Sequence, residues 1–209
     1  MLVPGSALAQ PLPDLGGSAA TILSPQTERR LGESIVRDMR RDPQFIDDPE
    51  ISEYLGTLGA RLSEVTRGAR QDFEFFAVRD ASINAFALPG GFVGVHTGLL
   101  NAAETESQLA SVLAHEIAHV TQRHIARMLG QQQQMQLPVL VALAAAVLLG
   151  RSRPDLAMGA AAAAQAGAVS AQLAYSRDFE READRVGLRS LGEAGFDPRA
   201  MAAFFDKMQ

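Results

Sequence analysis

Two histidines separated by three residues lie inside a long helical stretch, in the sequence His115-Glu116-Ile117-Ala118-His119. On a helix, residues four apart are rotated by about 400°, so both imidazoles project from one face about one turn apart. Two imidazoles placed in this way can bind a single metal ion. Glu116 is rotated by about 100° from His115, which places its carboxylate beside that ion, where it can act as a general base on metal-bound water. The motif therefore predicts a fold built round a metal-binding helix.

The composition limits what else can bind the metal. None of the 209 residues is cysteine, which excludes disulfides, iron–sulfur clusters and cysteine-based zinc ribbons. Further ligands must therefore be histidines or carboxylates. The formal net charge is −5 and no basic stripe is present, so we expect no nucleic-acid partner. Hydrophobic residues make up 47% of the chain, enough for one ordinary core.

A third ligand is available in a second helical stretch, which begins near Asp178. Glu180 and Asp184 are four residues apart and share a helix face. Glu180 can complete a site of two histidines and one glutamate for one Zn²⁺, leaving the fourth position for water. Asp184 can then accept a hydrogen bond from the far nitrogen of a ligand histidine. Glu182 is a competing ligand that points to another face, and the alternative for the whole segment is an ordinary charged helix surface.

Other arrangements of the third ligand fail. The metzincin pattern needs glycine at position 122 and histidine at position 125, where this chain has Gln122 and Ile125. His124 is one residue before the position at which the metzincin pattern needs its third histidine. We assign it to an outer contact of the metal site or to a helix-surface contact, and the periodicity favours the surface contact.

The hydrophobic periodicity predicts an α+β fold that is mostly helical, with a small sheet of three short strands and an alanine-rich helical hairpin. Each arm of the hairpin is shorter than the ~18–20 residues that span a bilayer. The expected helices are 28–41, 48–65, 104–130, 178–194 and 197–209, the strands 72–78, 83–88 and 92–96, and the hairpin arms 137–149 and 156–169.

The chain divides into three expected parts. Residues 1–9 end in small residues spaced as at a signal-peptidase site, so we interpret them as a signal-peptide remnant, with a construction scar as the alternative. Residues 10–26 are rich in proline, glycine and serine and predict an extended arm. Residues 27–209 form the expected zinc metallopeptidase domain. An export signal predicts an exported protein.

The strand before the metal-binding helix is a candidate for substrate binding. Asn84, Ala85 and Phe86 would lie beside the site, where an exposed strand edge can hold an extended peptide. A plain hairpin that adds Phe86 to the core is an equally good interpretation. For residues 137–169 we expect packing on the core, with a lid or a membrane-surface contact as the lesser alternative.

Three segments together resemble one known family. HEIAHVTQRH, SRDFEREAD and NAFALPGG are similar to the gluzincin family of zincin-like metallopeptidases that includes the CAAX prenyl, HtpX-type and Oma-type proteases. LPDLG, ERRLGE and AGFDPRAMAAFFDKM resemble its periplasmic, BepA-like branch. The resemblance implies zinc ligands at His115, His119 and Glu180, the general base at Glu116 and an outer partner at Asp184. It also implies an endopeptidase for misfolded or stalled envelope proteins, with the outer-membrane assembly machinery as a partner.

The resemblance implies one further set of groups. In the BepA-like branch a histidine and an arginine near the metal, then tetratricopeptide repeats, follow the segment that ends here at Gln209. The donors to a developing oxyanion are therefore expected beyond Gln209, with Arg177 and Tyr175 as candidates within the chain. The alternative function is a chaperone-like or self-inhibited module with a zinc site, and Glu116 distinguishes the two because a structural site has no use for it.

Overall fold

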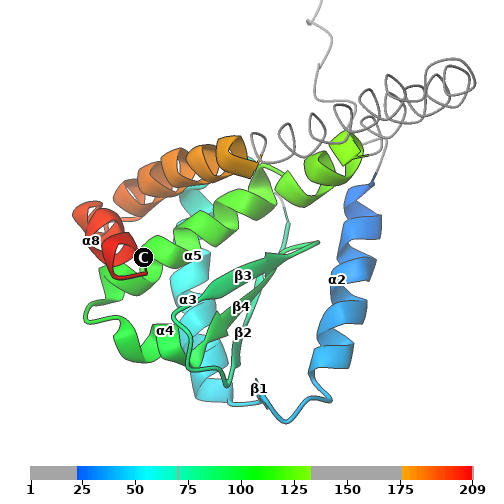
Figure 1. Ribbon diagram of the computed structural model, residues 1–209, viewed down its shortest axis with the longest axis horizontal. Coiled ribbons are helices and arrows are strands. Elements are labelled where there is room, and N and C mark those ends of the chain that lie inside the picture. Colours follow the sequence, from blue (N-terminus) through cyan, green and yellow to red (C-terminus); the bar gives the residue numbers. More distant parts are fainter. Residues whose placement is uncertain (1–22, 70, 133–175, 209) are drawn as a thin grey trace, which may run out of the picture.

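A small mixed sheet lies at the centre of the fold (Figure 1). The computed structural model describes residues 23–69, 71–132 and 176–208. The strand order is β1-β2-β4-β3; β2 and β4 are parallel, and the two outer pairs are antiparallel. The strands are β1 (Phe45–Ile46), β2 (Glu74–Val78), β3 (Ala85–Leu88) and β4 (Phe92–His96). The three expected strands are present, and β1 adds a fourth that is too short to produce a periodic pattern.

Helices cover both faces of this sheet. On one face α3 (Pro49–Val65) and α5 (Glu106–Thr121) pack against the strands and form the larger core. α2 (Pro25–Met39) covers the other face, where Val36 is buried with Phe76 and Phe92. The caps follow from the sequence: Ser24 and Asp48 accept backbone N–H groups at the starts of α2 and α3, and a proline follows each. The expected α+β class, mostly helical with a small sheet, is confirmed.

The turn between β3 and β4 fixes the position of α2. Gly90 has a φ of 81°, and a Cβ there would lie 2.4 Å from the Cα of Arg29, so helix and turn meet backbone to backbone. The Arg29 guanidinium donates to the Gly90 carbonyl (3.0 Å) and lies over the Phe92 ring (4.2 Å). The geometry of this turn therefore also fixes the end of β3.

The predicted continuous helix over 104–130 is wrong. The chain forms α4 (Thr97–Ala102), then α5 as far as Thr121, then a separate helix over 124–132. Arg123 divides the last two, because its φ is 55° and a left-handed residue cannot continue a right-handed helix. Periodicity did not reveal this break, since no glycine or proline marks it.

Two C-terminal helices complete the described part. A helix over 176–193 lies beside α5, and α8 (Arg199–Met208) packs against α5 (Figure 1). Phe196, Met201 and Phe204 join the larger core. The expected hairpin over 137–169, residues 1–9 and most of the expected arm over 10–26 lie outside the described residues. The end of that arm is helical instead of extended, because Pro25 begins α2. Among the described helices, none has the length and apolar character that a membrane span requires.

Candidate metal centre

α5 presents both histidines of the motif on one face, as the spacing predicts. The opposite face is anchored in the core by Leu109, Leu113 and Ile117. The Nε2 atoms of His115 and His119 lie 3.0 Å apart. The two side chains are 12% and 18% exposed, so they are held by packing but remain reachable from solvent.

The helix over 176–193 brings the third expected ligand to the same place. Glu180 Oε2 lies 3.3 Å from His115 Nε2, and Oε1 lies 3.6 Å from His119 Nε2. Gly187 permits this approach, because a Cβ there would lie 3.0 Å from the backbone nitrogen of His115. The two histidines hold the pKa of the Glu180 carboxyl well below its usual range. The predicted trio therefore converges although its members come from two separate helices.

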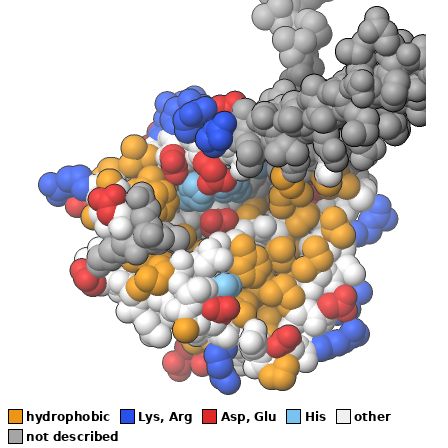
Figure 2. All heavy atoms as spheres, in the orientation of Figure 1, with side chains coloured by type: hydrophobic (Ala, Val, Ile, Leu, Met, Phe, Trp, Pro, Cys, Tyr) orange, Lys and Arg blue, Asp and Glu red, His pale blue; other side chains and the backbone are white. Residues whose placement is uncertain are grey.

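These donors fit a tetrahedral zinc ion. Ligand atoms about 2.0–2.1 Å from such an ion are about 3.3–3.4 Å apart. The two histidine nitrogens are 3.0 Å apart, and each lies 3.3 or 3.6 Å from one of the two Glu180 oxygens, which is close to that value. All three donor atoms lie within 4.8 Å of one another. In Figure 2, histidine side chains are visible at the surface among carboxylates, above an area of hydrophobic side chains.

Asp184 lies where an outer partner of His115 is expected. Its Oδ1 is 2.9 Å from His115 Nδ1. The oxygen lies off the line of the ring N–H, so this buried nitrogen makes no aligned hydrogen bond. Burial opposes protonation of His115, but Glu180, Glu116 and Asp184 together outweigh it and raise the pKa of His115.

Glu116 lies beside the two histidines and is not among the three converging donors. Burial raises the pKa of its carboxyl, and the neighbouring His115 and His119 oppose that rise. The nearby backbone N–H of Ala87, on β3, also lowers this pKa. The edge strand β3 therefore lies next to the expected general base.

His124 is buried against the metal site, which contradicts the expected surface contact. Its Nδ1 lies 3.0 Å from Nδ1 of His119, and only 3% of the residue is exposed. Burial, together with the neighbouring His119, lowers the pKa of His124 to about 4, so the ring is neutral at pH 7. The out-of-phase spacing misled because it assumed a continuous helix, and the break at Arg123 turns His124 back.

The expected substrate contacts are only partly brought to the site. Ala85 lies on the edge strand β3, but the Phe86 ring packs edge-on against Phe76 on the α2 side of the sheet. Asn84 precedes β3 and pairs with His96 through its backbone carbonyl. Arg177 is exposed one turn before Glu180. Tyr175 lies outside the described residues.

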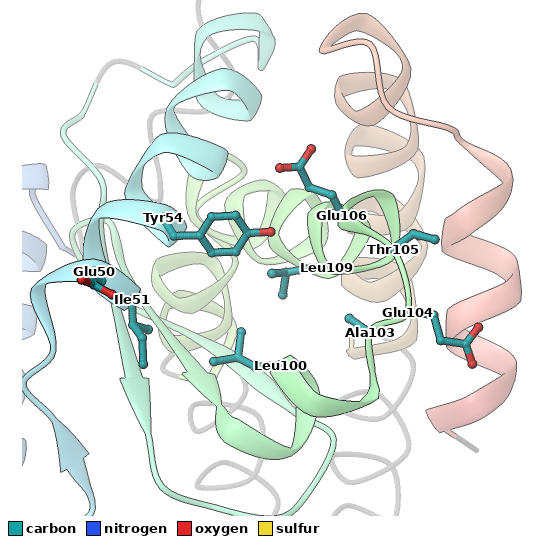
Figure 3. Close-up of a pocket in the computed structure, with 9 residues that line it drawn as sticks. All are labelled: Glu50, Ile51, Tyr54, Leu100, Ala103, Glu104, Thr105, Glu106 and Leu109. Carbon is teal, nitrogen blue, oxygen red and sulfur yellow. The ribbon is translucent and has the colours of Figure 1, made fainter.

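A hollow of about 430 Å³ lies elsewhere, between the start of α3 and the start of α5. Figure 3 shows the Tyr54 ring extending across it, with Leu100 and Leu109 on its apolar side. Glu50 and Glu106 are at its rim. No candidate ligand lines this hollow, so it is separate from the metal centre.

Comparison with known proteins assigns the family. The model of peptidase family M48 matches residues 50–208, which include both helices of the metal centre. The chain belongs to peptidase family M48. The M48 match covers every candidate ligand as well as Glu116.

The M48 relatives include bacterial and mitochondrial proteases. The chain is 40% identical over 200 residues to the beta-barrel assembly-enhancing protease of Escherichia coli, covering 96% of this chain and 41% of that protein. The protein of that name from Yersinia pestis is 41% identical over 197 residues, with 94% and 40% covered. The mitochondrial metalloendopeptidase OMA1 of Arabidopsis thaliana is 29% identical over 196 residues, with 93% and 38% covered. The chain thus spans about two fifths of the length of these relatives.

Proposed function

We propose that this chain is a zinc-dependent endopeptidase domain that hydrolyses peptide bonds at the site formed by His115, His119, Glu180 and Glu116. The observation that supports this most is the convergence of three zinc-type donors beside a carboxylate that is not one of them. One Zn²⁺ per chain, held by those three donors, would supply an acidified water and polarise the carbonyl under attack.

The roles of the protein groups follow from their positions. Glu116 is the general base: it takes a proton from the attacking water and passes it to the leaving amine. The nearby N–H of Ala87 lowers the pKa of the Glu116 carboxyl and so favours its charged form. Asp184 orients His115 from behind, as carboxylates commonly do for metal-binding histidines. A group for the developing oxyanion is proposed at Arg177.

We propose the outer edge of β3 as the place where an extended substrate binds. His96 donates its N–H to the Asn84 carbonyl, and hydrogen-bonded pairs alternate along antiparallel strands, so Asn84 and Phe86 direct their backbone groups to β4. Ala85 and Ala87 then direct theirs to the open edge. The Ala87 N–H lies near Glu116, which leaves Ala85 to pair with a peptide.

The wider role is proposed from the relatives. Two of them are named beta-barrel assembly-enhancing proteases, so we propose that the substrates here are misfolded or stalled envelope proteins and that the outer-membrane assembly machinery is a partner. An exported, periplasmic protein fits this role. In this proposal residues 1–9 are a signal remnant, an arm follows up to the start of α2, and the peptidase domain extends from α2 to residue 209. Residues 137–169 are proposed for a membrane-surface contact.

Substituting the general base tests the peptidase proposal. Glu116→Gln keeps the shape of the side chain but removes its basicity, so turnover of an unfolded protein by the zinc-loaded chain should fall by about 10²–10⁴-fold. Zinc content, measured by elemental analysis, should stay at one per chain. Glu193→Gln, an exposed position at the end of the same helix as Glu180, should leave both unchanged. Bound zinc with equal turnover in wild type and Glu116→Gln would overturn the proposal in favour of a chaperone-like module.

A further inference from the structure

We propose that His124 is a positioning residue for the metal: it accepts the Nδ1–H of His119 and thereby fixes the nitrogen with which His119 binds zinc. This inference rests on the proposed metal site. It adds a second, separate support to that site, on the side away from Asp184.

The break at Arg123 makes the contact possible. In a continuous helix, residues 119 and 124 are rotated by about 500°, or about 140° apart, and cannot face each other. The left-handed conformation of Arg123 ends α5 and changes the direction of the chain, so the new helix over 124–132 starts with His124 against His119. Strained backbone of this kind persists where the surrounding structure holds it. Here it places one imidazole behind another.

The hydrogens in this contact can be assigned from the partners. His119 faces His115 and Glu180 with Nε2, so metal binding uses Nε2 and leaves the proton on Nδ1. The other side of that 3.0 Å contact, His124 Nδ1, must then accept. The proton of His124 is therefore on Nε2, which lies 3.2 Å from Oε2 of Glu182.

Glu182 is itself fixed from the far side. Arg127 Nη1 donates to the same Oε2 at 2.7 Å. The polar chain thus runs from Arg127 through Glu182 and His124 to His119, and every donor in it meets an acceptor. Such outer partners orient a ligand and increase its basicity, and their loss typically costs about 10–100-fold in metal affinity or activity.

Packing holds the ring of His124 in the required plane. It stacks on Phe179 at 4.6 Å between centroids and 17° between planes. Arg127 lies over the Phe179 ring, with its Cζ 4.7 Å from the centroid of that ring. Phe179 and Glu182 flank the ligand Glu180 on one helix, so this helix supplies the third ligand and also supports the second.

The test separates the nitrogens of His124 from its packing. His124→Phe keeps the stack on Phe179 but removes both nitrogens, whereas His124→Asn places an amide oxygen near the position of Nδ1 and restores the acceptor. Zinc affinity of the full chain is measured by competition with a chelator. We expect about 10–100-fold weaker binding for His124→Phe and a loss of less than about threefold for His124→Asn. The melting temperature of metal-free His124→Phe should be no lower than that of wild type.

A spectroscopic readout and a double-mutant cycle complete the test. Cobalt-loaded His124→Phe should show an altered d–d absorption spectrum, and His124→Asn that of wild type. Glu182→Gln should weaken zinc binding by about 3–10-fold alone but have no further effect in the His124→Phe background. Should His124→Phe fail to fold, Glu182→Gln alone carries the test.

The possible failures are distinguishable. Wild-type zinc affinity in His124→Phe, or in Glu182→Gln, overturns the inference and leaves the proposed peptidase site intact. Equal losses in His124→Phe and His124→Asn also overturn it, because packing alone would then explain the effect. If the wild-type chain binds no zinc, the proposed metal site and this inference are overturned together.

Discussion

At the scale of single residues, Arg123 links the metal centre to the N-terminal helix. Among the described residues it is the one non-glycine position with positive φ. Its guanidinium donates to the Leu23 carbonyl and to Glu28 Oε1, the latter at 3.3 Å. Glu28 is only 6% exposed, so this pair holds a buried carboxylate in place. The residue that re-aims His124 is therefore held by contacts to α2.

Two substitutions of Arg123 should separate the contributions that its backbone conformation and its side chain make to the free energy of unfolding. Arg123→Ala leaves the buried Glu28 carboxylate without its partner and keeps a Cβ at positive φ, so we expect a loss of about 2–4 kcal/mol in the free energy of unfolding. Arg123→Gly loses the same ion pair but tolerates the backbone conformation, and should be about 1 kcal/mol less destabilised. Urea unfolding measures both. Equal losses would show that the left-handed backbone carries no cost here.

At the scale of elements, the site depends on how closely two helices approach. α5 supplies two ligands, and the helix over 176–193 supplies the third, so the distance between their axes sets the geometry of the donors. Gly187 lies at the closest point: a Cβ there would be 3.0–3.1 Å from the backbone of Ala114 and His115. Backbone atoms inside a helix cannot shift individually, so an added methyl group must move one helix as a whole.

Adding one methyl group at this crossing should weaken metal binding. Gly187→Ala should cost about 1–3 kcal/mol in stability through overpacking, although alanine is the better helix former. It should also lower zinc affinity, because Glu180 moves away from the histidines. Gly192→Ala is the matched control on the same helix, where the added Cβ meets only the Pro198 Cγ at 3.4 Å. We expect it to be neutral or stabilising by up to about 1 kcal/mol in thermal melts. Tighter zinc binding by Gly187→Ala would contradict this account.

At the scale of the whole molecule, the metal centre joins parts that are distant in the sequence. β3 lies next to Glu116 at Ala87, α5 carries the histidines, and the helix over 176–193 closes the site. A ligand that binds only the assembled site stabilises the whole fold by mass action. Metal binding should therefore raise the stability of the entire domain.

Removal of zinc should lower the melting temperature. With zinc at about 100 times its Kd, binding adds about 2.7 kcal/mol of stability, which corresponds to about 5–10 °C for a chain of this size. Calorimetry with zinc and with a chelator measures the difference. Glu180→Gln should abolish most of it, whereas Glu116→Gln should retain it, because Glu116 is not one of the three donors. An equal shift in wild type and Glu180→Gln would place the stabilising metal elsewhere.

The local patterns of the sequence were enough to predict most elements and three of the site's positions. Helix spacing placed His115 and His119 on one face and Glu116 beside them, because a helix has a fixed rotation per residue. The same rule paired Glu180 with Asp184. It failed at β1, which is too short for a period, and beyond Thr121, where one left-handed residue ends the helix without a glycine or proline to announce it.

The tertiary structure alone decided which of these local pieces meet. Convergence of Glu180 on the histidines depends on a close helix crossing at Gly187, and no spacing along the chain encodes the distance between two helices. The contact of His124 with His119 depends on a single backbone dihedral angle at Arg123. The sequence therefore determined the chemistry available for the site, because residue type and helix period are local. Only packing determined which nitrogen and oxygen atoms support one another, because those contacts are long-range.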